Sequence, residues 1–137
     1  MGLYNSFRSA AVEVPDNDLR RLAAYSNKGD LDVYQMAAQK TSSCKTSHEK
    51  IENGALGLCG EAGECADLVK KYMFQGHALD RDRLAEELGD VLWYCAELAE
   101  GLDMKLSEVA EMNIRKLEKR YPDGFDPDRS RNREVDA

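Results

Sequence analysis

The sequence has few of the features that define several large classes of protein. It contains three prolines in 137 residues and no glycine- or serine-rich tract, and no apolar run approaches the roughly 18 residues that a membrane-spanning helix needs. The N-terminus has no basic segment followed by an apolar one, so a secretion signal is not predicted. We therefore expect a folded cytoplasmic protein of one domain, without a membrane as its partner.

Cysteine pairs with C-x-x-C spacing are also absent. The four cysteines are Cys44, Cys59, Cys65 and Cys95. Since most of them fall at apolar positions of expected helices, we predict that they are reduced core residues of a cytosolic protein.

Basic residues are outnumbered by acidic ones. Nineteen Lys and Arg against 26 Asp and Glu give a formal net charge of −7 and a pI near 4.9. A chain with this balance repels duplex nucleic acid, so nucleic acid is not expected as a partner. With 42% hydrophobic and 33% charged residues, the composition favours a largely helical protein.

Apolar residues recur at three- and four-residue intervals in four segments, which predicts four helices. Breakers around Gly29, Gly76 and Pro122 separate or end these segments. Because the connections are short, we predict an all-α, antiparallel four-helix bundle. The predicted helices cover residues 31–44, 47–74, 80–102 and 107–121.

The same pattern divides the chain into three regions. Residues 1–29 form a leader with a short helix expected at 18–25, residues 30–121 form the helical domain, and residues 122–137 form an Arg-rich tail. Asp30 is expected to cap the first helix of the domain. The tail has almost nothing to bury, so we expect it to stay mobile.

Two short acidic clusters give the best indication of chemistry. Glu61 and Glu64, then Glu87 and Asp90 starting 26 residues further on, each flank a small or apolar residue and a glycine. Residues at i and i+3 share a helix face, so each cluster projects two carboxylates side by side. Four converging negative charges require a cation, and oxygen ligands favour Mg²⁺ or Mn²⁺ over zinc.

These clusters also have a simpler interpretation, because the border of any amphipathic helix carries charged residues. Glycines inside the helices weigh against it, since each destabilises a helix by about 0.5–1 kcal/mol relative to alanine. A merely solvated surface does not require them. The glycines are Gly57, Gly60, Gly63 and Gly89.

Histidine is scarce, which bears on the kind of metal. A helical di-iron site carries Glu-x-x-His on two helices, whereas the corresponding positions here hold Glu64 and Asp90. The two histidines, His48 and His77, lie near opposite ends of the second predicted helix. They cannot both join the acidic clusters, so redox chemistry is disfavoured.

Other polar residues flank the apolar stripes of the third and fourth predicted helices. Asn113, Lys116 and Arg120 recur at i, i+3 and i+7 in the fourth predicted helix, and Tyr94 flanks the stripe of the third. We expect them at the edge of the same core as the carboxylates.

Five further polar residues are weaker candidates. Lys70 and Lys71 could contact phosphate, and Gln35, Gln39 and Thr41 of the first helix could read a base edge. A solvated helix face is the competing interpretation of all five.

Several segments together resemble the MazG-like all-α nucleoside triphosphate pyrophosphohydrolases. The E-x-x-E pair is followed after 22 residues by E-x-x-D, with G-x-x-G-E, D-V-L-W-Y, N-x-x-K-L and R-Y-P-x-G-F around them. The segments that carry the resemblance are residues 57–64, 67–71, 86–94, 113–117 and 120–125.

This resemblance implies Mg²⁺-dependent hydrolysis of a (deoxy)nucleoside triphosphate to monophosphate and pyrophosphate, in a helical dimer or a tetramer of dimers. Such an activity would remove unwanted triphosphates from the nucleotide pool. The resemblance also implies that Asn113 and Lys116 contact phosphate or ligand and that Tyr94 lies near the nucleotide. With such a substrate, Lys116 and Arg120 could hold the leaving pyrophosphate, and Tyr94 could face the base. The implied metal ligands, which carry the catalysis, are Glu61, Glu64, Glu87 and Asp90.

Two alternatives stay open at this point. One is a non-catalytic helical interaction module that uses the acidic patch to bind a partner. The other is a related pyrophosphohydrolase, such as a phosphoribosyl-ATP pyrophosphatase.

Overall fold

The structure is a computed structural model that describes residues 31–132. The predicted leader with its short helix, and the Asp30 cap, lie outside these residues. The described part of the chain forms helices and no strand, so the all-α class is confirmed. None of its helices combines the length and apolarity that a bilayer span requires. The helices are α2 (Leu31–Gln39), α3 (Ser47–Phe74), α4 (Arg81–Gly101), α5 (Leu106–Arg120) and α6 (Pro127–Arg131).

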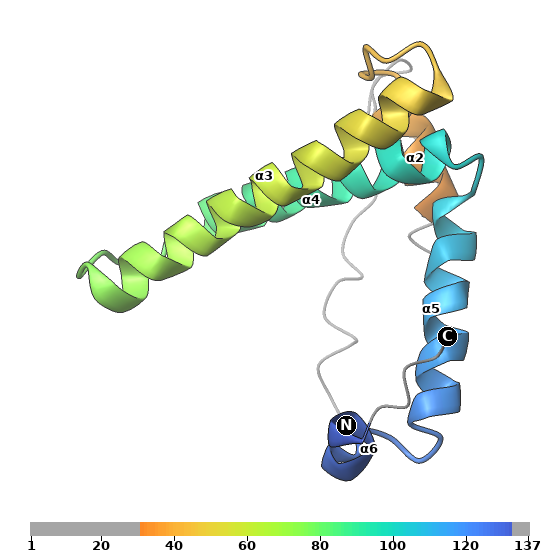
Figure 1. The fold of residues 1–137 in the computed structure, drawn as a ribbon. Helices are drawn as coiled ribbons and strands as arrows, with labels where there is room; N and C mark the ends of the chain where they lie inside the picture. The colour runs from red at the N-terminus through yellow and green to blue at the C-terminus, as the bar shows by residue number, and fades with distance from the viewer. Residues whose placement is uncertain (1–30, 133–137) are drawn as a thin grey trace, which may run out of the picture.

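Helices α3 and α4 form a long antiparallel hairpin (Figure 1). Thr46 caps α3 by accepting a hydrogen bond from the N–H of Glu49, and the Glu49 carboxylate accepts one from the N–H of Thr46. Asp80 caps α4 by accepting from the N–H of Arg83. Each cap satisfies donors that the first helical turn leaves unpaired. The predicted starts of both helices are confirmed to within a residue or so.

Glycine lets the two helices approach closely near the end of the hairpin where α2 and α5 join it. A Cβ atom at Gly54 would lie 2.8 Å from Leu98, and one at Gly101 would lie 2.8 Å from the backbone nitrogen of Ile51. Packed interiors do not tolerate such short contacts. Packing therefore requires glycine at both positions.

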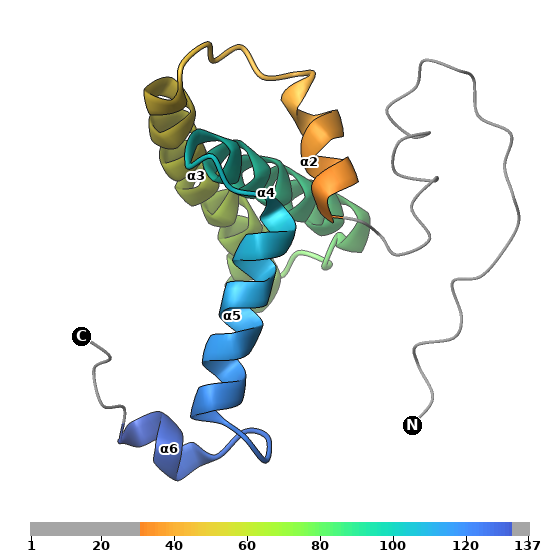
Figure 2. The same cartoon turned by 90° about the vertical axis from the view of Figure 1, so that its right-hand side faces the viewer.

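Helix α2 crosses the hairpin at this end, and the start of α5 lies beside it (Figure 2). Trp93 and Tyr34 pack against the buried core that these elements share. The buried side chains are mostly small, which allows the helix axes to cross closely. The core residues are Ala38, Ala96, Ala99 and Leu106.

Side chains of α2 also cap the start of α5. The buried Gln35 accepts a hydrogen bond from the N–H of Leu106 at 2.6 Å and donates one to the Glu100 carboxylate at 2.9 Å. Asp32 accepts from the N–H of Ser107, and hydrogen bonds from Ser107 lower the pKa of Asp32. Gln35 was predicted to be solvated or to read a base edge, and both predictions are wrong because its amide is occupied by this structural role.

A fully buried carboxylate, Glu97, ties α2 and the following loop to α4. It accepts hydrogen bonds from Gln39 Nε2 at 2.9 Å and Ser42 Oγ at 2.6 Å, and the Lys50 ammonium lies 3.9 Å away. Burial raises the pKa of Glu97, but hydrogen bonds from Ser42, Gln39 and Cys44 and the charge of Lys50 outweigh it and hold the pKa below its ordinary value. The buried charge is therefore compensated.

Two boundaries differ from the predicted ones. Helix α2 ends at Gln39 rather than near residue 44, because the Thr41 hydroxyl donates to the Ala38 carbonyl and draws the chain into a turn. The tail was predicted to be mobile, but helix α6 begins directly after Asp126. The Asp126 carboxylate caps this helix by accepting a hydrogen bond from the N–H of Asp128.

The cysteines are unpaired, as predicted. Cys44, Cys65 and Cys95 are half-buried, whereas Cys59 is exposed. The prediction of a core position is therefore wrong for Cys59.

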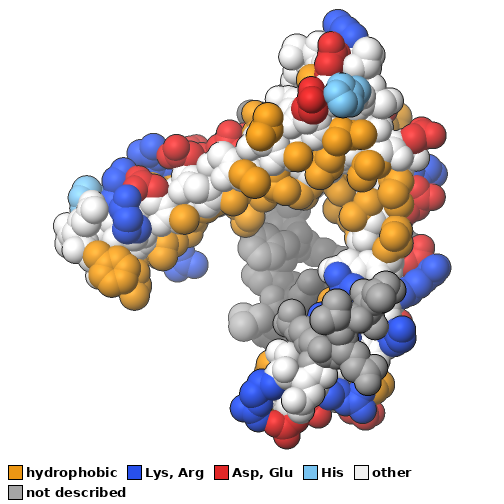
Figure 3. Space-filling model, in the orientation of Figure 1, with side chains coloured by type: hydrophobic (Ala, Val, Ile, Leu, Met, Phe, Trp, Pro, Cys, Tyr) orange, Lys and Arg blue, Asp and Glu red, His pale blue; other side chains and the backbone are white. Residues whose placement is uncertain are grey.

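The described helices do not close into a bundle within one chain. Helix α5 starts beside the hairpin and runs away from it (Figure 1), and Figure 3 shows apolar side chains gathered along the underside of the hairpin and the adjoining part of α5. This apolar face is left uncovered by residues 31–132. Large apolar side chains that are more than a third exposed include Met73, Leu88, Leu92, Met112, Ile114 and Leu117.

Replacing Glu97 with alanine is expected to lower the free energy of unfolding by about 3 kcal/mol at neutral pH, because Gln39, Ser42 and Lys50 lose their buried acceptor. Since the pKa of Glu97 is depressed below 4.5, its contribution is present above that value and is lost as the pH falls through the folded-state pKa. Urea unfolding followed by circular dichroism at neutral and acidic pH measures both effects. An equal loss in Glu86→Ala, an exposed carboxylate of the same helix, would contradict this account.

Candidate functional site

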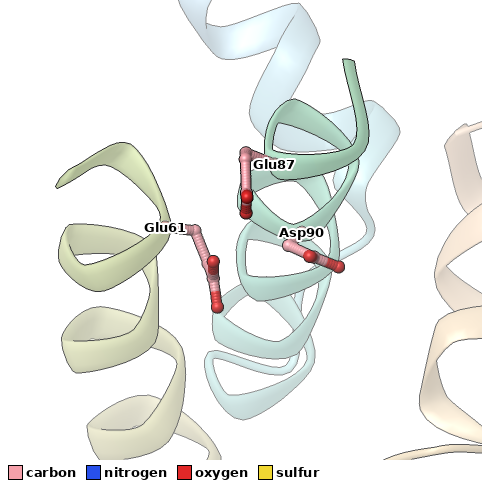
Figure 4. Close-up of side chains that lie close together, drawn as sticks. All are labelled: Glu61, Glu87 and Asp90. Atoms are coloured by element: carbon pink, nitrogen blue, oxygen red, sulfur yellow. The ribbon is translucent and has the colours of Figure 1, made fainter. Parts of the chain in front are cut away.

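Carboxylates of α3 and α4 converge midway along the hairpin (Figure 4). One carboxylate oxygen from each of Glu61, Glu87 and Asp90 lies within 4.8 Å of the other two. Glu61 extends from α3, Glu87 extends from α4, and Asp90 follows one turn later on α4. Antiparallel pairing thus joins two distant acidic clusters into one set, which we name the carboxylate group.

The negative charges of this region act on one another. The pKa of Glu61 is raised, first by its partial burial between the helices and then by the charges of Asp90, Glu87 and Glu64. The folded chain therefore disfavours the ionised form of Glu61. A bound cation would reverse this effect, because it would stabilise the ionised form.

Glu64, the fourth predicted ligand, lies at the edge of the carboxylate group. It is exposed and does not belong to the carboxylate group, yet its charge reaches Glu61. Glu87 lies 3.6 Å from the Arg83 guanidinium one turn earlier in α4. That ion pair is on the surface and contributes little to stability. Three of the four predicted ligands are therefore brought together by the fold.

The geometry of the carboxylate group suits a hard divalent cation. Mg²⁺ binds oxygen at about 2.1 Å, so two of its ligands are separated by at most about 4.2 Å. Oxygens up to 4.8 Å apart reach that spacing after small side-chain rotations or through a bridging water. The two histidines are exposed near opposite ends of α3. An oxygen-only donor set favours Mg²⁺ or Mn²⁺ over zinc.

An aromatic pair lies one turn beyond Asp90. The Tyr94 ring covers Gly57 of α3, where a Cβ atom would lie 2.1 Å from the ring. Trp93 packs edge-on against Tyr94 with ring centroids 4.9 Å apart, and its Nε1–H donates to Thr41 Oγ1 at 2.8 Å. Gly57 is therefore required by Tyr94. Thr41 is exposed, as its interpretation as a solvated side chain predicts, and its hydroxyl accepts the hydrogen bond from Trp93.

Tyr34 of α2 is a neighbour of the site that the sequence pattern did not indicate. Its pKa is raised, first by burial and then by the negative charge of Asp90 and by Cys95. The phenol therefore lies near the carboxylate group. No local periodicity could have revealed this, because the position of Tyr34 depends on how α2 crosses α4.

The predicted phosphate-contacting residues of α5 lie apart from the hairpin. Asn113 and Lys116 are exposed and Arg120 is half-buried, on a helix that runs away from α3 and α4 in two perpendicular views (Figures 1 and 2). Within one chain, the fold does not bring α5 alongside the carboxylate group. Their contact with a ligand stays a prediction.

Lys70 and Lys71, the weaker candidates, both form ion pairs with Asp67 of the same helix. Hydrogen bonds from these two lysines lower the pKa of Asp67 to about 2. They also lie about 14 Å beyond Glu61 along α3 at 1.5 Å per residue. A role in holding pyrophosphate is therefore not supported within one chain.

The fold and the site together define an all-α protein whose paired helices bring three carboxylates close together. A family model described as the MazG nucleotide pyrophosphohydrolase domain matches residues 49–125, which include almost all of α3 and the whole of α4 and α5. The chain belongs to this family. Membership implies a pyrophosphohydrolase that acts on nucleotides and typically depends on a metal ion.

A curated relative gives a second comparison. Gene 37 protein of Mycobacterium phage L5 is 41% identical to the chain over 104 residues, which cover 69% of the chain and 90% of that protein. Its name describes no activity. No solved structure matches the chain with statistical significance.

Glu61→Gln is expected to raise the melting temperature of the cation-free protein, because it removes one charge from a repelling set. The same variant should lose the additional stabilisation that Mn²⁺ gives to the parent protein. Thermal unfolding with and without Mn²⁺, together with titration calorimetry, tests both statements. Glu86→Gln removes the same charge elsewhere on the hairpin and should keep full Mn²⁺ binding.

The raised pKa of Glu61 also sets the pH dependence of cation binding. Because its ionised form is the ligand, Mn²⁺ affinity should increase as the pH rises from 4.5 through the raised folded-state pKa. Without the cation, the same shift makes the folded state bind more protons than the unfolded one, so stability should fall over that window. Affinity that is independent of pH in the window would contradict the assignment of Glu61 as a ligand.

Proposed function

We propose that the protein hydrolyses (deoxy)nucleoside triphosphates between the α and β phosphates, releasing a nucleoside monophosphate and pyrophosphate, with Mg²⁺ as cofactor and Mn²⁺ as a possible substitute. The observation that carries the proposal is the meeting of Glu61, Glu87 and Asp90 within 4.8 Å on the hairpin of a MazG-family domain. A triphosphate carries about four negative charges, so only bridging cations let it approach such a group. In the cytoplasm this activity would remove unwanted triphosphates from the nucleotide pool.

The four acidic residues have different roles in this proposal. Glu61, Glu87 and Asp90 hold the cation from two helices, and Glu64 rotates inward from the edge to complete the ligands. A Mg²⁺ ion held by these residues would neutralise phosphate charge and lower the pKa of the attacking water. One of the four carboxylates accepts the proton that this water loses.

In this proposal the nucleoside lies beside Tyr94. The ring of Tyr94 offers a flat apolar surface one turn from Asp90. The phosphates then extend along the hairpin toward the carboxylate group, where the cation lies. This orientation keeps the charged part of the substrate at the charged part of the site.

We infer that a second copy of the chain completes the assembly, as a homodimer or a tetramer of dimers. Large apolar side chains are exposed on both α4 and α5, among them Leu88, which is 62% exposed, and Met112, which is 59% exposed, and burying such side chains against another chain is favourable. In that assembly Asn113, Lys116 and Arg120 of one chain contact the phosphates bound by the other. The catalytic domain is residues 30–121, with the leader and the Arg-rich tail outside it.

A triphosphate panel tests the reaction. With Mg²⁺ the protein is expected to convert at least one nucleoside triphosphate to monophosphate and pyrophosphate, as resolved by anion-exchange chromatography. Glu87→Gln should lower kcat/KM by about 10²- to 10³-fold, while Glu86→Gln should leave it unchanged. Chelating the metal should abolish activity.

Other products would exclude the proposal in favour of a rival. Orthophosphate and a diphosphate would show a different bond cleaved. Activity confined to phosphoribosyl-ATP would indicate the related pyrophosphohydrolase, and no hydrolysis of any substrate would favour a non-catalytic interaction module.

Sedimentation equilibrium tests the assembly. The mass in solution is expected to be two or four times the 15.4 kDa of the chain. Leu88→Glu should lower that mass toward one chain, because a charge would be buried in the interface, and the circular dichroism of the helices should be retained. A monomeric parent protein at micromolar concentration would contradict the inferred assembly.

A further inference from the structure

Tyr34 lies on the side of α2 that faces the middle of the hairpin. Ala38 packs in the core with Ala96 and Ala99 of α4, so its side of α2 is the one turned toward α4. At 100° per residue, Gln35 lies about 60° to one side of Ala38, where it binds the start of α5. Tyr34 lies about 40° to the other side. Its ring therefore extends away from α5 and along α4 toward the carboxylate group.

Asp90 lies on the face of α4 that α2 covers. It precedes Glu97 by seven residues, so the two side chains are only about 20° apart around the helix and about 10 Å apart along its axis. Gln39 of α2 donates its hydrogen bond to Glu97 on this face. Burial raises the pKa of Tyr34, and the negative charge of Asp90 raises it further. The Tyr34 phenol and the Asp90 carboxylate are therefore neighbours across the contact between α2 and α4.

The Tyr34 hydroxyl has a donor that the described chain does not use. The residue is half-buried and packs against the core, and no hydrogen bond joins its hydroxyl to another side chain or backbone group of residues 31–132. Tyrosines in such positions usually pair their O–H, because an unpaired donor beside apolar surface is unfavourable. The acceptor whose charge reaches this hydroxyl is Asp90.

We propose that Tyr34 is a positioning residue of the cation site, whose hydroxyl donates a hydrogen bond to Asp90 when Asp90 holds the cation. This inference rests on the proposed function, which assigns the cation to the carboxylate group. One oxygen of Asp90 binds the cation and the other accepts from the phenol. Carboxylate ligands of metal ions are typically oriented by a hydrogen bond of this kind.

Helix α2 presents the phenol from a fixed position. Gln35 and Gln39 tie α2 to the start of α5 and to Glu97, so the place of the Tyr34 ring is set by the fold and not by the cation. Asp90 is exposed, and ordering an exposed side chain costs conformational entropy. A donor that is already in place limits the orientations of Asp90 and thereby favours the one that binds the cation.

The experiment measures the Mn²⁺ affinity of Tyr34→Phe in the full-length protein by titration calorimetry. Phenylalanine keeps the ring in the core and removes only the hydroxyl, so the cation-free variant should unfold at the same temperature as the parent. Its Mn²⁺ affinity should fall by about 10- to 100-fold. Tyr72→Phe is the matched control, because it removes the hydroxyl of a tyrosine that is 48% exposed near the end of α3. This control should keep the parent affinity.

Double substitutions test whether Tyr34 acts through Asp90. In an Asp90→Ala background, Tyr34→Phe should cause no further loss of Mn²⁺ affinity, because the acceptor is already gone. In a Glu64→Gln background it should cause the full loss, since Glu64 lies on α3 at the edge of the carboxylate group. The electron paramagnetic resonance signal of free Mn²⁺ measures these weaker affinities.

Several outcomes would overturn the inference and leave the proposed function intact. One is an unchanged Mn²⁺ affinity in Tyr34→Phe with a parent that binds Mn²⁺; if KM for the triphosphate rose in that variant, the hydroxyl would be assigned to the substrate instead. Another is an equal loss in the Asp90→Ala and Glu64→Gln backgrounds. A lower unfolding temperature of cation-free Tyr34→Phe would assign Tyr34 to packing alone. If the parent binds no Mn²⁺ and hydrolyses no triphosphate, the proposed function fails, and this inference fails with it.

Discussion

Helices α3 and α4 pack so closely that glycine is required where they approach each other most nearly. Gly54, Gly57 and Gly101 each face an occupied position on the opposite helix, and a Cβ atom at any of them would lie less than 3 Å from it. Because these three contacts follow one another along the hairpin, a slip in register would place side chains in filled volume. The same register sets Glu61 opposite Glu87, so the carboxylate group is a consequence of this packing.

Polar contacts, more than apolar burial, decide where the remaining helices lie. The buried core is small, and the position of α2 depends on the hydrogen bonds that Glu97 accepts from Gln39 and Ser42. Gln35 then directs the start of α5 by accepting from its backbone. Through these contacts α2 brings Tyr34 near the carboxylates, while α5 leaves the hairpin and exposes apolar surface.

Two features of the hairpin are unfavourable for the isolated chain. The raised pKa of Glu61 reports repulsion and burial in the carboxylate group, and the open glycines lower the helix propensity of α3 without any gain in packing. Stability alone explains neither feature. A cation would offset the first, which agrees with membership of the MazG nucleotide pyrophosphohydrolase family.

Local information in the sequence was enough to predict the four main helices, the starts of α3 and α4 to within a residue or so, and the acidic residues that the carboxylate group contains, because periodicity and helix-start signals act over a few neighbouring residues. Only the tertiary structure decided which side chains meet. Glu64 stays at the edge while Glu61 enters the carboxylate group, and Gln35 is buried as a cap rather than solvated. Those outcomes depend on the register and crossing of whole helices, which the packing of residues distant in the chain sets.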